Sequence, residues 1–171
     1  MANRAYLYSN DAYEWRPIEP YFNSRWNIPL AWFFFYSETN IFLADVKYED
    51  DSWEELKLVA QKDQAVKTFT DRIPLLSAIL QHRYNGTHID DLLGKVTQWS
   101  GSFLLLDPQE VFGGGGYDIE FHIDKFTTIL RQLAATDPDH DALLNNLLFY
   151  SGEYFDTEND QLITVIGNTY W

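Results

Sequence analysis

Residues 123–148, IDKFTTILRQLAATDPDHDALLNNLL, decide the helical part of this fold. Their apolar side chains recur every three or four positions, which is the spacing of one face of a helix. The pattern is interrupted at Asp137-Pro138, where an acidic cap followed by proline is typical of a helix start. We therefore predict two helices, whose buried faces consist of Ile123, Phe126, Ile129, Leu130 and Leu133 and of Leu143, Leu144, Leu147 and Leu148.

Two more helices are expected upstream. From Lys62 the apolar residues again follow helical spacing as far as residue 80, and Pro74 should interrupt or kink that helix. Thr87 and Asp90 have the spacing of a capping box, and the apolar stripe that follows them runs to Trp99.

The type of two other segments is less clear. For residues 27–36, Asn27 as a cap and Pro29 in the first turn favour a helix, although the aromatic run would equally suit a buried strand. For residues 53–60 the type stays open, because the segment begins with the capping-box spacing of Ser52 to Glu55.

Strands are expected where apolar residues alternate or β-branched residues gather. These segments are 4–9, 41–46, 102–106 and 162–166. Together the elements predict an α+β fold: a single globular domain, residues 1–171, in which a mixed sheet containing the 4–9, 102–106 and 162–166 strands is covered by several amphipathic helices.

The composition predicts a folded chain that needs no covalent or metal support. Of its 171 residues 46% are apolar, which is enough for one core despite the acidity. The chain contains no cysteine, which excludes disulfides and thiolate metal sites, and its longest apolar run, residues 28–36, is about half the length of a membrane span. Since the first residues also do not resemble a secretory signal, we expect a cytoplasmic protein that does not bind a membrane.

Charge is the strongest indication of a partner. The formal net charge is −14, and Arg131 is the last basic residue. Such a surface repels nucleic acid and anionic lipid and attracts cationic surfaces, because summed charge governs long-range encounter. The sequence therefore predicts a basic protein partner and no nucleic-acid partner.

Two acidic segments are the candidate partner-binding residues. The stretch 150–160 mixes aromatic side chains with acids and contains no base, a combination that suits an anchor inside an acidic rim. The predicted contacts are Tyr154, Asp156, Glu158 and Asp160, with a second patch at Asp50, Asp51 and Glu54. The first 26 residues also hold seven aromatic residues that could anchor an interface, although core packing explains any single one more simply.

Clusters of carboxylates and histidines have a structural explanation as well as a catalytic one. Glu120, His122 and Asp124 would share one face of a strand and could hold a divalent cation, but a solvated strand end before a helix capped by Asp124 is simpler. The clusters at 88–91 and 137–141 are expected at helix starts, and the glycines at 113–116 in a flexible loop. We therefore expect no catalytic residue, no bound metal, no cofactor and no enzymatic activity.

Three segments carry a resemblance to known sequences. The opening MANRAYLYS, the segment NIPLAWFFFYS at 27–37 and the LLLDP turn at 104–108 resemble a family of uncharacterised bacterial proteins that begin Met-Ala-Asn-Arg-x-Tyr-Leu-Tyr-Ser. The resemblance implies a small cytoplasmic bacterial protein, similar to the immunity partners that are encoded beside secreted polymorphic toxins. It implies no catalytic residues.

Charge and resemblance together give a leading hypothesis: an acidic immunity protein that binds and blocks a cognate basic toxin domain. Two alternatives remain at this point. One is a divalent-metal-dependent hydrolase that uses Glu120, His122 and Asp124, and the other is an inhibitor that mimics nucleic acid through regularly spaced carboxylates. The sequence leaves the oligomeric state open.

Overall fold

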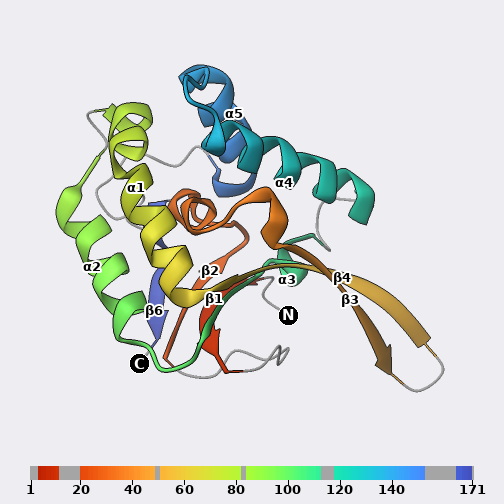
Figure 1. The fold of residues 1–171 in the computed structure, drawn as a ribbon. Helices are drawn as coiled ribbons and strands as arrows, with labels where there is room; N and C mark the ends of the chain where they lie inside the picture. Colours follow the sequence, from red (N-terminus) through yellow and green to blue (C-terminus); the bar gives the residue numbers. More distant parts are fainter. Residues whose placement is uncertain are drawn as a thin grey trace.

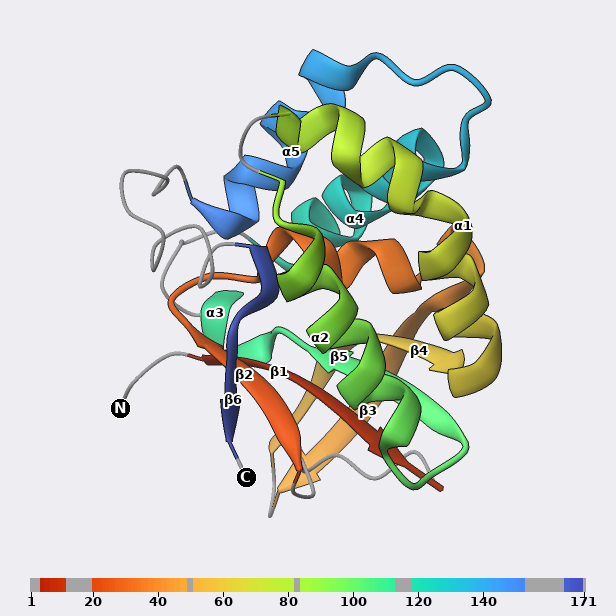
Figure 2. The same cartoon turned by 90° about the vertical axis from the view of Figure 1, so that its left-hand side faces the viewer.

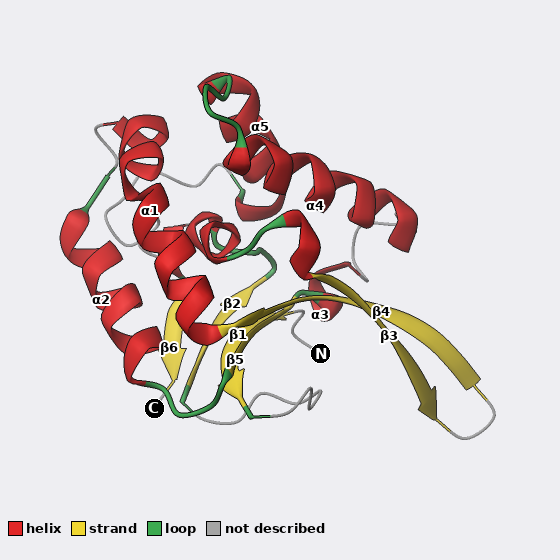
Figure 3. Cartoon of the chain, in the orientation of Figure 1, coloured by secondary structure: helices red, strands yellow, loops and turns green. Residues whose placement is uncertain are grey.

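The computed structural model describes residues 4–11, 20–48, 51–81, 84–112, 118–152 and 165–170. The glycine run 113–116, expected in a loop, lies outside these ranges. Figure 3 shows the described elements by type. The strands are β1 (Arg4–Asn10), β2 (Tyr21–Arg25), β3 (Ile41–Tyr48), β4 (Asp51–Gln61), β5 (Phe103–Asp107) and β6 (Asn168–Tyr170). The helices are η1 (Leu30–Phe35), η2 (Glu38–Asn40), α1 (Lys62–Leu80), α2 (Gly86–Gln98), α3 (Gln109–Phe112), α4 (Ile119–Ala134) and α5 (His140–Ser151).

The strands form one sheet in the order β3-β4-β5-β1-β2-β6. The predicted α+β class is confirmed, but the prediction of a mixed sheet is wrong, because every strand pair in the described ranges is antiparallel. The connection from β4 to β5 shows the reason. Two helices, α1 and α2, connect these strands in the sequence and run in opposite directions (Figure 1). The chain therefore returns to the end of the sheet that it left. Gln61 at the end of β4 accordingly pairs with Phe103 at the start of β5.

The longer helices lie on one side of the sheet, as Figure 2 shows. Between them and the sheet lies the 3-10 helix η1, in which all six residues are buried. Its aromatic rings contact the surrounding helices: Phe33 packs edge-on against Phe126 of α4, and Phe35 lies 4.4 Å from Phe69 of α1, centroid to centroid. The helix favoured by the sequence for residues 27–36 is thus confirmed only in part: it is a 3-10 helix, Leu30–Phe35, that begins after Pro29, and the predicted cap at Asn27 is wrong.

The helix starts are displaced from the predicted caps. Asn85, rather than Thr87, caps α2 and accepts hydrogen bonds from the backbone at 87 and 88. Asp118 caps α4 and Asp139 caps α5, each by accepting a backbone N–H three residues further on. In each case the capping side chain belongs to the residue directly before the first helical turn, where the backbone N–H groups have no partner within the helix.

Three other predictions are settled by the structure. Residues 53–60, whose type was open, belong to β4, with Leu56, Leu58 and Ala60 buried on one face. Helix α1 continues through Pro74 without ending. The strand predicted at 162–166 is wrong where it is described: Val165 and Ile166 are helical, and the closing strand is β6.

The β3–β4 hairpin extends beyond the rest of the sheet. In the described ranges, β4 pairs with β3 from Asp51 to Leu58 but with β5 only from Leu58 to Gln61. We call the part of this hairpin beyond the β5 pairing, residues 42–48 and 51–57, the arm. It projects past the helices in Figure 1. None of the helices that the structure describes has both the length and the apolar character needed to cross a membrane.

Candidate protein-binding surface

The structure places part of the predicted partner-binding set on the arm. Asp51 begins β4 and pairs with Tyr48, and Glu54 is exposed three residues further on. Asp50 lies outside the described residues, as does the whole first set, Tyr154, Asp156, Glu158 and Asp160. Of the second acidic patch, the side chain of Glu54 can therefore be examined in its structural setting, and the first set stays a prediction.

Asp45 and Glu54 lie directly opposite each other on the arm. They are cross-strand partners in the β3–β4 ladder, and both side chains are exposed. Cross-strand partners lie on the same sheet face with their Cβ atoms about 5 Å apart, where two like charges repel each other. The chain thus carries an unfavourable pair on its most projecting element.

Large apolar side chains accompany these acids on both faces of the arm. Leu43 is 41% exposed and lies on the face of Asp45 and Glu54, while Trp53 is 42% exposed and lies on the opposite face. The Trp53 indole N–H donates to Oε1 of Glu55 at 3.0 Å, which fixes the ring beside a carboxylate. Exposed aromatic and aliphatic groups among acids are typical of a protein-binding surface.

A buried ion pair fixes the root of the arm. Lys57 of β4 is fully buried, and its Nζ lies 2.5 Å from Oδ2 of Asp107 on β5 and 3.4 Å from Oε2 of Glu55. Burial, reinforced by the charges of Asp107 and Glu55, raises the pKa of Tyr8 above its ordinary range. The Lys57–Asp107 pair holds β4 in register against β5, so the arm begins at a fixed point of the sheet.

The proposed metal-binding arrangement of Glu120, His122 and Asp124 does not form. The segment is helix α4, and residues two apart on a helix point in widely different directions. Glu120 and Asp124 are exposed, whereas His122 is buried against the ring of Phe112, with Nδ1 2.9 Å from the hydroxyl of Tyr150. Nor does Asp124 cap the helix. Across the described ranges, no group of three or more metal-binding side chains comes together.

Burial changes the chemistry of His122. It lowers the pKa of this imidazole below its ordinary value, because a charged ring would lose its hydration, and the nearby Asp118 carboxylate partly offsets the effect. The ring stacks on Phe112 at 3.8 Å between centroids. His122 therefore supports the packing of α3, α4 and α5 as a neutral core residue.

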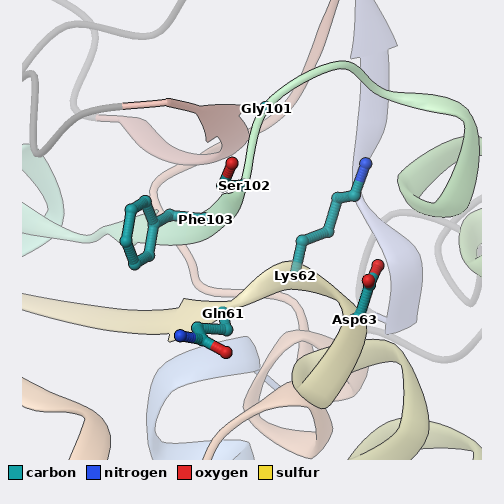
Figure 4. A pocket seen from close by; sticks show the side chains of 6 residues that line it. All are labelled: Gln61, Lys62, Asp63, Gly101, Ser102 and Phe103. Atoms are coloured by element: carbon teal, nitrogen blue, oxygen red, sulfur yellow. The ribbon is translucent and has the colours of Figure 1, made fainter.

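An open pocket of about 420 Å³ lies where α1 begins, and Figure 4 shows its lining. Two of its polar lining residues already bond to neighbouring parts of the chain. Lys62 donates through Nζ to the carbonyl of Trp99, and Ser102 donates through both its backbone N–H and its hydroxyl to Oδ1 of Asp11. No arrangement of a nucleophile and a base appears among its lining residues, which are Gln61, Lys62, Asp63, Gly101, Ser102 and Phe103.

Comparison of the chain with family models, curated proteins and solved structures finds no match. The surface must therefore be interpreted from its own chemistry. The sequence predicted Asp51 and Glu54 as partner contacts, which stays a prediction, and did not single out Asp45, which lies opposite Glu54, or the exposed Leu43 and Trp53. The alternation in 41–48 indicated a strand, but only the pairing register shows which residue of the next strand faces it.

Proposed function

We propose that this chain is an acidic protein-binding module that docks a basic protein through the arm. Among such modules, an immunity protein that blocks a cognate toxin domain fits the size, charge and sequence resemblance best. The observation that carries the proposal is the pair Asp45 and Glu54, held face to face on an exposed hairpin. The repulsion between the two carboxylates destabilises the isolated arm. A lysine or arginine of a partner placed between them would attract both carboxylates and offset this repulsion.

The mechanism is steric and electrostatic blockade. Long-range attraction between an acidic inhibitor and a cationic surface raises the association rate, and apolar groups buried at the contact slow dissociation. Leu43 and Trp53 are placed for the second role, one on each face of the arm. A projecting two-stranded element of this kind can enter a cleft and exclude a substrate from it.

The arrangement of the arm favours a protein partner over mimicry of nucleic acid. A mimic requires carboxylates that follow the regular spacing of phosphates. On the arm, the carboxylates of Asp45 and Glu54 occupy one face together with Leu43, and the carboxylate of Glu55 occupies the other together with Trp53. Apolar side chains thus interrupt both rows.

The proposal predicts that the neighbouring gene encodes a secreted protein with a toxin-like C-terminal domain. The test uses that domain, purified separately, as the binding probe, and cytochrome c as an unrelated basic control. We expect the domain, but not cytochrome c, to form a complex at low salt and micromolar concentration that elutes as one species. Elution of the domain and this chain as separate species would contradict the proposal for that domain.

The role of the arm is tested by reversing its charge. Asp45→Lys with Glu54→Lys should lower the association rate about tenfold and flatten its salt dependence. The matched control is Asp137→Lys with Asp141→Lys, which makes the same change of net charge at exposed positions away from the arm. If both double variants bind alike, net charge rather than the arm governs docking, and the proposed site is wrong.

A further inference from the structure

The outer edge of β3 can receive another strand. β3 pairs with β4 on one side, and no strand in the described ranges pairs with it on the other. Over residues 43–48 this side belongs to the arm, which projects past the helices in Figure 1. A two-stranded ribbon is only marginally stable by itself, and a third strand stabilises it. The arm therefore has both a place for an added strand and a physical reason to bind one.

The β3 edge lacks two features that usually protect an edge strand from further pairing. The register between β3 and β4 runs without a skipped residue from Ile41 to Tyr48, so β3 contains no bulge. Proline is also absent from both strands. The backbone of β3 is thus a regular template, and its side chains decide which strand it accepts.

Asp45 selects the charge of an added strand. It is exposed, and Glu54 lies opposite it on β4, so both residues lie on one face of the arm. A strand paired with β3 places one residue directly opposite Asp45 on that face. An acid at this position would be repelled by Asp45, whereas a lysine or arginine would be attracted by Asp45 directly and by Glu54 from one strand further. The edge thus accepts a basic strand.

Leu43 selects an apolar residue in the same added strand. It lies two residues before Asp45 on the same face and is 41% exposed. Every strand pair in the described ranges is antiparallel, and a strand added in that sense runs from Asp45 toward Leu43. The accepted pattern is therefore a base, then any residue that suits a strand, and then an apolar residue.

A second copy of the chain is the competing occupant of this edge. Two copies, each with a formal net charge of −14, repel each other, and β3 contains a single base, Lys47, to offset that repulsion. A strand of a basic protein meets no such repulsion. The charge therefore favours the basic partner over self-association.

We propose that an extended segment of the basic partner binds along β3 as an added antiparallel strand, with a lysine or arginine opposite Asp45 and an apolar side chain opposite Leu43. In this mode of recognition, main-chain hydrogen bonds supply affinity and alternate side chains supply specificity. The inference rests on the proposed function, because it specifies how the arm binds its partner.

The first experiment titrates the ¹⁵N-labelled full chain with the peptide acetyl-Thr-Thr-Arg-Thr-Val-Thr-amide and follows the amide NMR resonances of the chain. Two further peptides carry N-methyl groups on alternate backbone nitrogens, one on the odd-numbered residues and the other on the even-numbered ones. Because only alternate N–H groups of a strand point toward its neighbour, one methylated peptide should bind at least about tenfold more weakly, and the other within about twofold of the unmodified peptide. Equal effects of the two methylations, or no binding of the unmodified peptide, would overturn the proposal.

A second measurement tests the register by exchanging charges. The chain with Asp45→Lys and Glu54→Lys should bind the arginine peptide about tenfold more weakly, and should prefer the same peptide with glutamate in place of arginine. The matched control, Asp137→Lys with Asp141→Lys, should keep the preference for arginine. If the arm variant and this control show the same preference, Asp45 does not face the added strand.

Sedimentation of the unchanged chain alone tests the competing occupant. We expect a monomer at micromolar concentration, and a dimer that the unmodified peptide dissociates would show that a second copy occupies β3, against the proposal. The proposed function is judged separately, by the complex with the toxin-like domain. If that complex forms while both methylated peptides bind alike, the arm docks through side chains alone, so this inference fails and the proposed function stands.

Discussion

At the scale of single residues, replacing two different glycines by alanine should change the stability of the fold in opposite directions. Gly101 has a φ of +103°, and a Cβ there would lie 2.7 Å from Oγ of Ser9 and 2.8 Å from the backbone nitrogen of Asn10. Gly101→Ala should therefore destabilise the fold by about 2 kcal/mol or more, through strain and overlap with β1.

Gly94 is the matched control, because it lies inside α2 and no atom from beyond its own turn of helix comes within 4 Å of the position that a Cβ would take. Gly94→Ala should stabilise the protein by up to about 1 kcal/mol, since alanine has the higher helix propensity. Urea denaturation of both variants checks the pair. Similar free energies of unfolding for the two would show that the close approach of residue 101 to β1 is wrong.

His122 predicts how stability depends on pH. Its folded pKa lies below the ordinary value of 6.5, so below that pH the unfolded chain takes up a proton that the folded chain resists. Stability should therefore fall as the pH falls below about 6.5, with a contribution of at most about 1.4 kcal/mol per pH unit. Above that range the ring is neutral in both states and contributes no slope.

The free energy of unfolding is measured from about pH 5 to about pH 7.5, in steps of about half a pH unit. His122→Phe keeps a ring against Phe112 but cannot titrate, so its slope below pH 6.5 should be smaller than that of the unchanged chain. Parallel pH profiles would mean that His122 does not resist protonation in the fold.

At the scale of elements, the buried pair Lys57 and Asp107 joins the arm to the sheet. Asp107→Asn removes the carboxylate that lies 2.5 Å from the buried ammonium of Lys57 and should cost about 3 kcal/mol, whereas adding Lys57→Met should recover much of that loss. The free energies of unfolding of Asp107→Asn, Lys57→Met and the double variant give the coupling energy between the two side chains.

The exposed pair Lys67 and Asp71 on α1 has the same 2.5 Å separation and serves as the control. Because solvent screens it, its removal should change stability by about 0.5 kcal/mol or less. Equal losses for the two pairs would contradict the buried setting of Lys57.

A second element-scale prediction concerns the charge repulsion within the arm. In a double-mutant cycle of Asp45→Asn and Glu54→Gln, the coupling should be unfavourable in the unchanged chain by about 0.2–1 kcal/mol. The repulsion should weaken at high salt, where exposed charges are screened. A coupling of zero at low salt would show that the two side chains turn away from each other.

The same elements show how far sequence could lead. Helical periodicity located α4 and α5 because one face of each meets the core, as with Phe126 and Leu147. It could not identify β4, because Ser52 to Glu55 imitate a capping box and the segment gains its strand character from pairing with β3. Parallel or antiparallel pairing was likewise beyond a local pattern, since it depends on where the two helices α1 and α2 return the chain.

At the scale of the whole molecule, charge was predictable and its arrangement was not. The acid at 54 stood out in the sequence, but its position opposite Asp45 comes from the β3–β4 register. Similarly, Trp26 was one of seven early aromatic residues with no feature to distinguish it. Its positive φ and the exposure of its side chain became visible only in the structure.

The whole-molecule prediction compares the two acidic segments as docking surfaces. One variant replaces Asp51 and Glu54 by lysine, and the other replaces Asp156, Glu158 and Asp160, which lie outside the described residues. If the proposed function is right, the arm variant should bind the basic domain about tenfold more slowly, because opposite potentials govern the encounter.

Stopped-flow association from about 20 to about 300 mM salt measures this effect for each variant. A loss confined to the arm variant would place the partner on the hairpin alone, whereas a loss in both would require a partner that contacts both acidic segments. Unchanged rates in both variants, with folding intact, would leave the negative charge with no role in docking.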